Sequence, residues 1–451
     1  MMEDLTRRNF MKIAGAGCAM LATTGFNCST SAKDRPNILI YLADDQFKSS
    51  VGCYGAEPSH TPNIDKLAEE GVRFTNCFTP SSICTPNRGV LLSGMYPIRN
   101  GAHANHSGFK DGVKSLPNYM KELGYRACIV GKDGIQKPSD LYEWEFRIEK
   151  SDETVPAAPP AKYEWMDSSR HKKTRFDEVE EFLGSEDKRP FCIFHAASLP
   201  HDPELGKLPN GLEGYDASNW YMDHELGKYL ELLEKYGLAK NTIVIYTNDN
   251  EAQKPRTKNT LYDTGLNVPM VIRWPGKAKP GSTNEELVTT LDILPTLFEL
   301  AGSTPPETLD GKSMLKMLKS GEYKLHDELY FSYTGVNVGN ADWKRVKTPY
   351  PIRAVRNKKY KYIRNLNHEI PNPKQGWIKP YEELYDIQKD PLETNNLADL
   401  KEMQSVKNEL SMKMDEWMEK IGDEGIEEEI RALEKYPPKW RDKEKYLKKK
   451  R

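Results

Sequence analysis

The sequence predicts an α/β fold in which a large, mainly parallel sheet is sandwiched by helices, followed by a smaller C-terminal α+β subdomain with an antiparallel sheet. Three observations predict it. Short, nearly all-apolar runs recur from residue 37 onwards, as expected of strands covered on both faces. Each run is followed by polar or glycine-rich residues and then by a helical period, which is typical of βα units. Beyond residue 302 this alternation stops, and residues 354–363 have the pattern of a hairpin with alternating exposed and buried positions.

The strands and helices of the larger part can be assigned in order. The predicted strands are residues 37–43, 125–130, 191–195, 242–247 and 268–273. The first helix has Thr61 as its N-cap, Pro62 at its first position and Gly71 just past its end. A second helix is predicted over 220–236, and the apolar spacing of 291–301 predicts a third that faces the core.

Composition limits the class of protein. The chain has 451 residues, of which 37% are hydrophobic, 10% aromatic and 29% charged, as in a soluble globular protein of two or three domains. Its 65 Lys and Arg residues nearly balance 67 Asp and Glu residues, for a formal net charge of −2. This balance argues against nucleic acid as a partner.

The chain is predicted to divide into three parts. Residues 1–32 have the layout of an export signal, because Arg7 and Arg8 precede an apolar run over 13–26, and they resemble a twin-arginine leader. An ordinary secretory leader is the alternative. Residues 33–324 form the α/β domain and 325–451 the C-terminal subdomain with a basic tail. We therefore expect an exported protein, periplasmic or extracellular, without a transmembrane segment after the leader; a lipid anchor at Cys28 is the alternative to a soluble product.

Polar side chains that follow the predicted strands are the first candidates for a site, because ligands of open α/β sheets bind beyond the carboxyl ends of the strands. These candidates are Asp44, Asp45, Lys132, His201, Asp249 and Asn250. Carboxylate and amide oxygens suit calcium or magnesium. Each acidic pair alone is more simply a turn or a helix cap, but two such pairs at one edge would repel each other without a cation between them.

A cysteine is predicted at the start of a helix. In the segment 84–94, Thr85 is expected to cap the helix and Pro86 to be its first residue, so that Cys84 lies just before it. Because a helix N-terminus stabilises negative charge, Cys84 or a group derived from it is a candidate nucleophile, with Arg88 one turn further on. A buried, inert cysteine is the alternative.

The segment Cys84-Thr85-Pro86-Asn87-Arg88, with Leu-Leu-Ser-Gly downstream, resembles the signature of formylglycine-dependent sulfatases in the alkaline phosphatase superfamily. Further segments match the family in order along the chain: Asn37 to Asp45, Gly131-Lys132, residues 200–203, Asp249-Asn250, 258–265, 268–276, and 383–386 with 390–391. The chain is therefore identified as a member of this family, and the resemblance implies a bacterial exported carbohydrate sulfatase.

The resemblance implies an alkaline phosphatase-like fold and assigns roles to residues. A maturation enzyme would convert Cys84 to formylglycine, whose hydrate attacks sulfur through one hydroxyl and releases sulfate by loss of a proton from the other. A divalent cation, usually Ca²⁺ with Mg²⁺ as the alternative, would be bound by Asp44, Asp45, Asp249, Asn250 and the modified Cys84. Lys132, His201 and Lys258 would hold the sulfate or protonate the leaving oxygen, and Arg88 would steady the hydrated aldehyde. The expected substrate is a sulfated polysaccharide or glycosaminoglycan fragment.

The sequence departs from the family at two places. Asn87 stands where serine is common, and Gly134 stands where many members have a histidine that assists the release of sulfate. Candidate replacements as proton acceptor are His103, His106, His195 and Asp133, although each histidine alone is more simply a surface or packing residue.

Two other functions remain open at this point. One is a phosphoester or phosphonate hydrolase on the same scaffold. The other is a protein that binds sulfated glycans without turnover, suggested by Gly134. A basic and aromatic surface of the C-terminal subdomain could track a sulfated chain, although a merely solvated face is as good an explanation. Its candidate residues are Trp343, Lys344, Arg345, Lys347, Arg353, Arg356, Lys358, Lys359, Lys361, Arg364 and Trp377.

Overall fold

The structure, a computed structural model, describes residues 35–131, 134–135, 142–158, 172–201, 204–321, 323–335, 351–368, 380–428 and 431. The predicted leader and basic tail lie outside these residues. The same holds for Lys132, Asp133, Trp343, Lys344, Arg345, Lys347 and Trp377.

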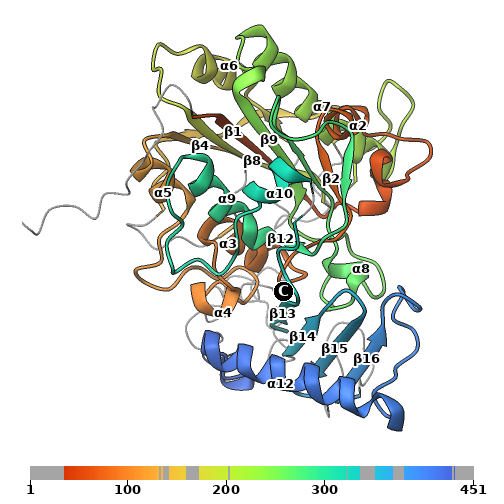
Figure 1. The fold of residues 1–451 in the computed structure, drawn as a ribbon. Coiled ribbons are helices and arrows are strands. Elements are labelled where there is room, and N and C mark those ends of the chain that lie inside the picture. The colour runs from red at the N-terminus through yellow and green to blue at the C-terminus, as the bar shows by residue number, and fades with distance from the viewer. Residues whose placement is uncertain are drawn as a thin grey trace, which may run out of the picture.

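A twisted eight-stranded sheet forms the centre of the described structure, in the order β11-β2-β10-β9-β1-β8-β4-β5 (Figure 1). Its strands are β1 (Asn37–Asp44), β2 (Val72–Phe74), β4 (Arg126–Gly131), β5 (Phe146–Ile148), β8 (Phe191–Pro200), β9 (Thr242–Asn248), β10 (Met270–Arg273) and β11 (Ser282–Asn284). The neighbours β9, β1, β8, β4 and β5 run parallel, whereas β10 is antiparallel to both β9 and β2. The predicted mainly parallel sheet is confirmed.

Helices cover both faces of this sheet (Figure 1). One face packs against α3 (Cys84–Ser93), α5 (Leu116–Glu122), α9 (Ile293–Leu300) and α10 (Leu315–Ser320) through Ile38, Ile40 and Leu42 of β1. The other packs against α2 (Pro62–Glu69), α6 (Phe176–Gly184) and α7 (Gly214–Lys235) through Leu39, Tyr41 and Ala43. Alternate side chains of β1 thus pack into hydrophobic cores on opposite faces of the sheet, which explains why the strand is mainly apolar. The predicted helix over 220–236 begins six residues earlier, at Gly214.

The C-terminal sheet, β13–β16, is antiparallel and consists of β13 (Leu329–Tyr333), β14 (Ile352–Arg356), β15 (Tyr360–Asn365) and β16 (Glu382–Asp386). Helix α12 (Gln404–Ile421) packs against it, as Figure 1 shows. The other described strands form two small pairs, β3 (Cys77–Phe78) with β12 (Val288–Thr289) and β6 (Lys150–Thr154) with β7 (Lys172–Thr174). The other described α-helices are the short α4 (Pro97–Asn100) and α8 (Asp263–Leu266).

The hairpin predicted over 354–363 is formed by β14 and β15, but its basic side chains are not the exposed surface that we expected. Arg353, Arg356 and Lys361 are 0%, 4% and 0% exposed, because each pairs with a buried carboxylate. Arg364 and Lys358 pair with acidic side chains as well. Arg353, Arg356 and Lys361 are therefore buried in structural ion pairs and do not form a track for a sulfated chain, whereas Lys358 and Lys359 are exposed.

A hydrophobic cluster joins the C-terminal sheet to the rest of the chain. It contains Phe331, Ile352 and Tyr385 of the sheet together with Ile83, which precedes α3, and Leu261, which precedes α8. The two parts therefore share buried apolar surface beside the candidate nucleophile. Among the described residues, no helix has both the length and the apolar character needed to cross a membrane.

Candidate active site

The polar residues predicted to follow the strands meet at one edge of the sheet. Strands β1 and β9 are parallel and in register through Ala43 and Asn248, so Asp44 and Asp45 end beside Asp249 and Asn250. The Asp45 amide donates to Asp249 Oδ1 at 3.2 Å, and Asn250 Nδ2 donates to Asp45 Oδ1 at 2.7 Å. Asp45 has a positive φ of 61°, a conformation that aspartate tolerates better than most residues.

Two further candidates belong to the neighbouring strands β8 and β4. His201 directly follows β8, whose Pro200 lies opposite Asp44 of β1. Lys132 would follow Gly131, the last residue of β4, but lies outside the described residues. A Cβ atom at position 131 would meet the Ala196 carbonyl oxygen at 2.5 Å, so only glycine fits at the end of this strand.

Cys84 is the first residue of α3, and Ile83 is its N-cap. This corrects the predicted cap at Thr85. The Thr85 hydroxyl is used elsewhere, since it accepts from the His106 amide at 3.0 Å and donates to the Gly134 carbonyl at 2.9 Å. Thr85 therefore joins the loop of His106 to position 134.

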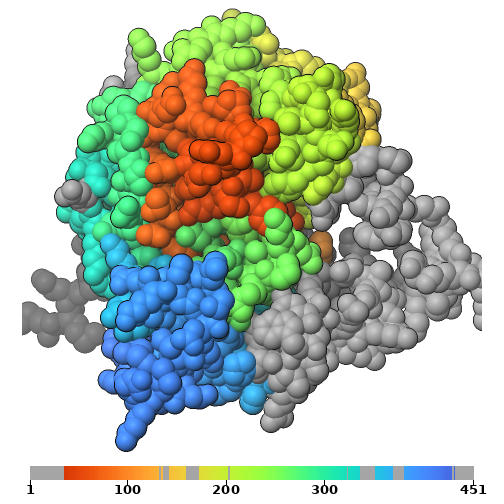
Figure 2. Space-filling view, turned by 90° about the vertical axis from the view of Figure 1, so that its right-hand side faces the viewer, coloured from red at the N-terminus to blue at the C-terminus, as the bar shows by residue number. Residues whose placement is uncertain are grey.

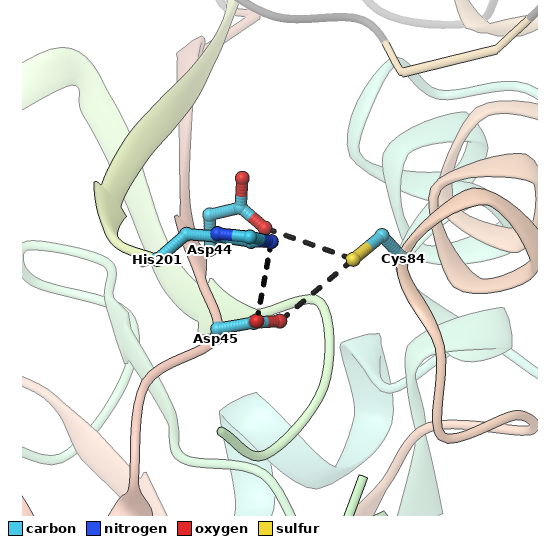
Figure 3. Close-up of side chains that lie close together, drawn as sticks. All are labelled: Asp44, Asp45, Cys84 and His201. Carbon is cyan, nitrogen blue, oxygen red and sulfur yellow. Dashed lines mark hydrogen bonds and ion pairs between the residues drawn. The ribbon is translucent and has the colours of Figure 1, made fainter. Parts of the chain in front are cut away.

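The Cys84 sulfur points into the acidic cluster (Figure 3). Its Sγ atom lies 3.9 Å from Asp44 Oδ1 and 3.7 Å from Asp45 Oδ1. Lys258 Nζ donates to both carboxylate oxygens of Asp45, at 2.5 and 2.6 Å, and lies 3.2 Å from Cys84 Sγ. His201 Nε2 lies 3.4 Å from Asp45 Oδ2. Acidic and cationic side chains thus surround the side chain of Cys84.

Arg88 lies one turn along α3 and is fully buried. Its Nε and Nη2 atoms both lie 3.0 Å from Asp249 Oδ2, and Nη2 lies 3.4 Å from Asp44 Oδ1. Asn87 donates through Nδ2 to the Asp249 backbone carbonyl and accepts from the Thr290 hydroxyl at 2.9 Å. Asn87, which stands where serine is common in the family, therefore joins α3 to the loop that carries Asp249.

Electrostatics argue against a free thiolate at Cys84. Burial raises the pKa of the Cys84 thiol to about 12, despite the nearby Lys258 ammonium. In the absence of a bound cation the thiol is therefore protonated at neutral pH, and the helix N-terminus alone does not make it a nucleophile. Burial and the neighbouring Asp44 raise the pKa of Asp249 to about 7, whereas Lys258 and His201 outweigh burial and lower the pKa of Asp45.

The residues present fit a hard divalent cation. Asp44, Asp45, Cys84 and His201 offer ligand atoms that lie within 4.8 Å of one another. Within the described part of the chain, the buried Asn250 Oδ1 has no hydrogen-bond partner, although Asn250 Nδ2 contacts Asp45. An orphaned amide oxygen beside three buried carboxylates is the donor set that calcium or magnesium prefers.

Two residues that we did not single out in the sequence tie the acidic loops together. The backbone amide of Gln46 donates to Asn248 Oδ1 at 3.3 Å. In turn, Asn248 Nδ2 donates to the backbone carbonyls of Gln46 and Asn250, both at 2.6 Å. In the sequence, the sign of such a role for Asn248 was an asparagine at the end of a mainly apolar predicted strand.

The candidate histidines differ in position. His195 is fully buried in the core, where it stacks on Tyr41 and contacts the Tyr229 hydroxyl. His103 is also buried, with Nε2 3.3 Å from the Glu428 carbonyl. Burial lowers the pKa of His103 to about 4 and that of His195 well below its usual value, so neither suits a base at neutral pH. His106 is exposed and is joined to Gly134 through Thr85.

Comparison with known proteins gives consistent matches over most of the chain. Residues 36–303 match the family model described as sulfatase, and residues 256–420 match the one described as N-sulphoglucosamine sulphohydrolase, C-terminal. An ulvan-active sulfatase of Formosa agariphila is 36% identical over 435 residues, which cover 88% of this chain and 82% of that protein.

Solved structures share the fold. A protein in complex with its substrate D-glucosamine-2-N,6-O-disulfate matches with a TM-score of 0.68 at 19% identity, over 86% of this chain and 99% of that one. The phosphonate monoester hydrolase of Agrobacterium radiobacter matches with a TM-score of 0.66 at 20% identity, over 86% and 96%. These likenesses and the topology confirm the predicted alkaline phosphatase-like fold.

Proposed function

The chain belongs to the sulfatase family and is a sulfuric ester hydrolase, and from this premise we propose that it removes sulfate from a sulfated carbohydrate through formylglycine at residue 84. The observation that carries the proposal is the position of Cys84, whose sulfur contacts Asp44, Asp45 and Lys258 while its thiol is too weakly acidic to react as a thiolate. A residue so placed needs modification to become a nucleophile.

The substrate class rests on the named relatives. One relative is called ulvan-active, and a structural neighbour was solved with a disulfated glucosamine. An exported enzyme would also meet polysaccharides outside the cell. We therefore propose a sulfated polysaccharide or glycosaminoglycan fragment as the substrate.

The residues of the site are suited to sulfuryl transfer. The hydrate of formylglycine would supply one hydroxyl to attack sulfur and a second whose deprotonation releases sulfate. A divalent cation held by Asp44, Asp45, Asp249, Asn250 and residue 84 would act as a Lewis acid on a sulfate oxygen.

Side chains around residue 84 would stabilise the developing negative charge, protonate the leaving oxygen and position the diol. Lys258 lies where it can stabilise negative charge on the sulfuryl oxygens, with Lys132 as a second such group. His201 contacts Asp45 and is the proposed acid for the leaving oxygen. Arg88, held by Asp44 and Asp249, would steady the diol.

We propose His106 as the proton acceptor in place of the absent histidine at position 134. It belongs to the loop that Thr85 links to Gly134, and it is the exposed member of the three histidines considered. Asp133, outside the described residues, is a weaker candidate because a carboxylate beside a cation is a poor base.

Export by the leader over 1–32 and modification of Cys84 by a maturation enzyme complete the proposal. N-terminal sequencing of the protein isolated from the periplasm or medium of its native host tests export. Retention of the full leader on a cytoplasmic product would contradict it.

Mass spectrometry of residue 84, followed by sulfate release from a panel of sulfated glycans, tests the activity. Formylglycine together with inorganic sulfate supports the proposal. Hydrolysis of phosphoesters to phosphate, or of phosphonate esters to the free phosphonate and an alcohol, without sulfate release would favour a phosphoester or phosphonate hydrolase. The Agrobacterium enzyme shares the fold of this chain. Glycan binding without turnover, despite verified formylglycine, would favour a binding protein.

A further inference from the structure

The segment that carries Lys258 is fastened by the C-terminal sheet. Residues 249–262 connect β9 to α8, and α8 lies beside β14–β16 in Figure 1. In Figure 2 the green residues of this part of the chain lie directly against the blue C-terminal residues. The contacts between them are polar and specific.

Asp263, the first residue of α8, is held by three side chains, those of Arg356, Lys361 and Glu393. Arg356 Nε and Lys361 Nζ each donate to one of its carboxylate oxygens at 2.8 Å. Its backbone amide donates to Glu393 Oε2 at 2.5 Å, and Lys361 Nζ also lies 3.2 Å from Glu393 Oε1. Lys361 and Glu393 are both 0% exposed, so two basic and two acidic side chains form one buried cluster.

Three further contacts hold residues on the two sides of Lys258. The Tyr333 hydroxyl donates to Asn259 Oδ1 at 3.3 Å, and the Tyr262 hydroxyl donates to Glu383 Oε2 at 2.8 Å. Arg256 donates to the Glu393 backbone carbonyl. The C-terminal sheet and the loop that follows it thus contact this segment on both sides of Lys258.

The same segment is tied to the nucleophile. The Asn259 amide donates to the Ser82 carbonyl at 3.0 Å, two residues before Cys84. Asn259 has a positive φ of 68°, so its conformation persists only where surrounding contacts define it. Ile83 and Leu261 share one hydrophobic cluster with Phe331 of the C-terminal sheet. Lys258 is therefore set against Cys84 by contacts from two directions.

We propose that Asp263, Lys361, Arg356 and Glu393 are positioning residues, which act through Asp263 to hold Lys258 within reach of residue 84. A buried charge cluster adds little stability compared with apolar side chains of the same volume, but it fixes geometry. Because a displacement of about 1 Å of a catalytic group can cost about 100-fold in rate, such geometry matters to the reaction. This catalytic consequence rests on the proposed sulfatase function, whereas the positioning itself does not.

The inference also gives a role to the C-terminal motif recognised in the sequence. Glu383 accepts from Tyr262, and the turn that begins at Asp390 carries Glu393 to Asp263. Residues far from the nucleophile in sequence thus support the segment next to it. The family match over 256–420 begins within this segment and extends through the C-terminal sheet.

The test compares two buried acidic residues of the C-terminal part in the full chain. Glu393→Ala removes the acceptor of the Asp263 amide. Asp423→Asn weakens the equally buried ion pair between Asp423 and Arg353 of β14, whereas the cations that bind Asp263 are Arg356 and Lys361. Hydrogen exchange is followed by mass spectrometry at a temperature where both variants are folded. Exchange over 256–266 should rise about 10-fold or more in Glu393→Ala and stay unchanged in Asp423→Asn.

Activity gives the second measurement, on protein whose formylglycine content has been checked. Sulfate release by Glu393→Ala should fall about 10- to 100-fold in kcat/KM. Glu393→Gln, which keeps an oxygen for the Asp263 amide, should lose less, and Asp423→Asn should remain within about 3-fold of the wild type. Unchanged exchange over 256–266 in Glu393→Ala, or equal losses in both positions, would overturn the inference. Absence of sulfate release from the wild type would contradict the proposed function instead, and the exchange comparison would still decide the positioning.

Discussion

Lys258 Nζ lies 3.2 Å from Cys84 Sγ, on the side of the sulfur that also faces the carboxylate of Asp45. The ammonium donates to both oxygens of Asp45. Burial alone would lower the pKa of Lys258, but Asp45 and the neighbouring carboxylates outweigh it and raise the pKa. Lys258 therefore stays charged at neutral pH, which suits it to stabilising an anion and not to transferring a proton.

We expect Lys258→Met to reduce kcat/KM for sulfate release by about 100-fold or more, since a charge aimed at the developing anion is lost. Steady-state kinetics with a sulfated glycan measure the effect. Lys254→Met is the matched control, because Lys254 is exposed on the same segment and lies over the Phe47 ring. Equal losses in the two variants would argue that the segment and not the charge matters.

Replacement of the nucleophile should abolish turnover while leaving the fold intact. Cys84→Ala removes one buried sulfur, which lies 3.2 Å from Lys258 Nζ and 3.7 to 3.9 Å from the carboxylates of Asp45 and Asp44. We expect sulfate release to fall at least about 1,000-fold, with the melting temperature within a few degrees of the wild type. Residual activity near the wild-type level would exclude residue 84 as the nucleophile.

The strand ends could be predicted from the sequence because their signals are local. Asp44 and Asp249 each end an apolar run, and parallel neighbours bring such ends together. The cap of α3 could not be predicted in this way, since Thr85 is a good cap by type. Its hydroxyl instead joins His106 to Gly134, two loops distant in sequence.

The burial of the C-terminal basic residues was likewise beyond the sequence pattern. Arg356 and Lys361 read as exposed hairpin positions, because charged residues are seldom buried without partners. Their partners, Asp263 and Glu393, are more than 30 residues away in sequence on either side. Only the tertiary fold identifies such pairs.

Removal of divalent cations should destabilise the protein. Three buried carboxylates, those of Asp44, Asp45 and Asp249, face two fixed cations, Arg88 and Lys258. A bound cation at 100 times its Kd would add about 2.7 kcal/mol to the free energy of unfolding. Treatment with a chelator, followed by thermal unfolding with and without added Ca²⁺ or Mg²⁺, measures this.

We expect the melting temperature of the chelator-treated protein to recover when Ca²⁺ is added. Asp249→Asn should reduce this recovery. Glu419→Gln, a change on the surface helix α12, should not. A melting temperature that does not depend on chelator or cation would contradict a cation site at this cluster.

His106→Gln should lower kcat by about 100-fold and remove the acidic limb of its pH profile, since a glutamine cannot accept the proton. His224→Gln is the control, because His224 is exposed on α7 and stacks on Trp220. A pH profile that keeps its acidic limb in His106→Gln would exclude His106 as the acceptor.

His103 should contribute to loss of stability in acid and not to catalysis. Its pKa is lowered by burial, and further by Arg353 and Lys110, to about 4, whereas the value in the unfolded chain is near 6.5. Between these values the unfolded state binds more protons, so stability is present above pH 6.5 and is lost as the pH falls towards 4.

From pH 7 to pH 5 the loss due to His103 should be about 2 kcal/mol in the free energy of unfolding by urea. His103→Gln should therefore show a smaller decrease over this range than the wild type by about that amount, with kcat/KM unchanged at pH 7. The same decrease in both proteins would mean that His103 is already protonated in the folded state, so that its burial does not exclude the charge.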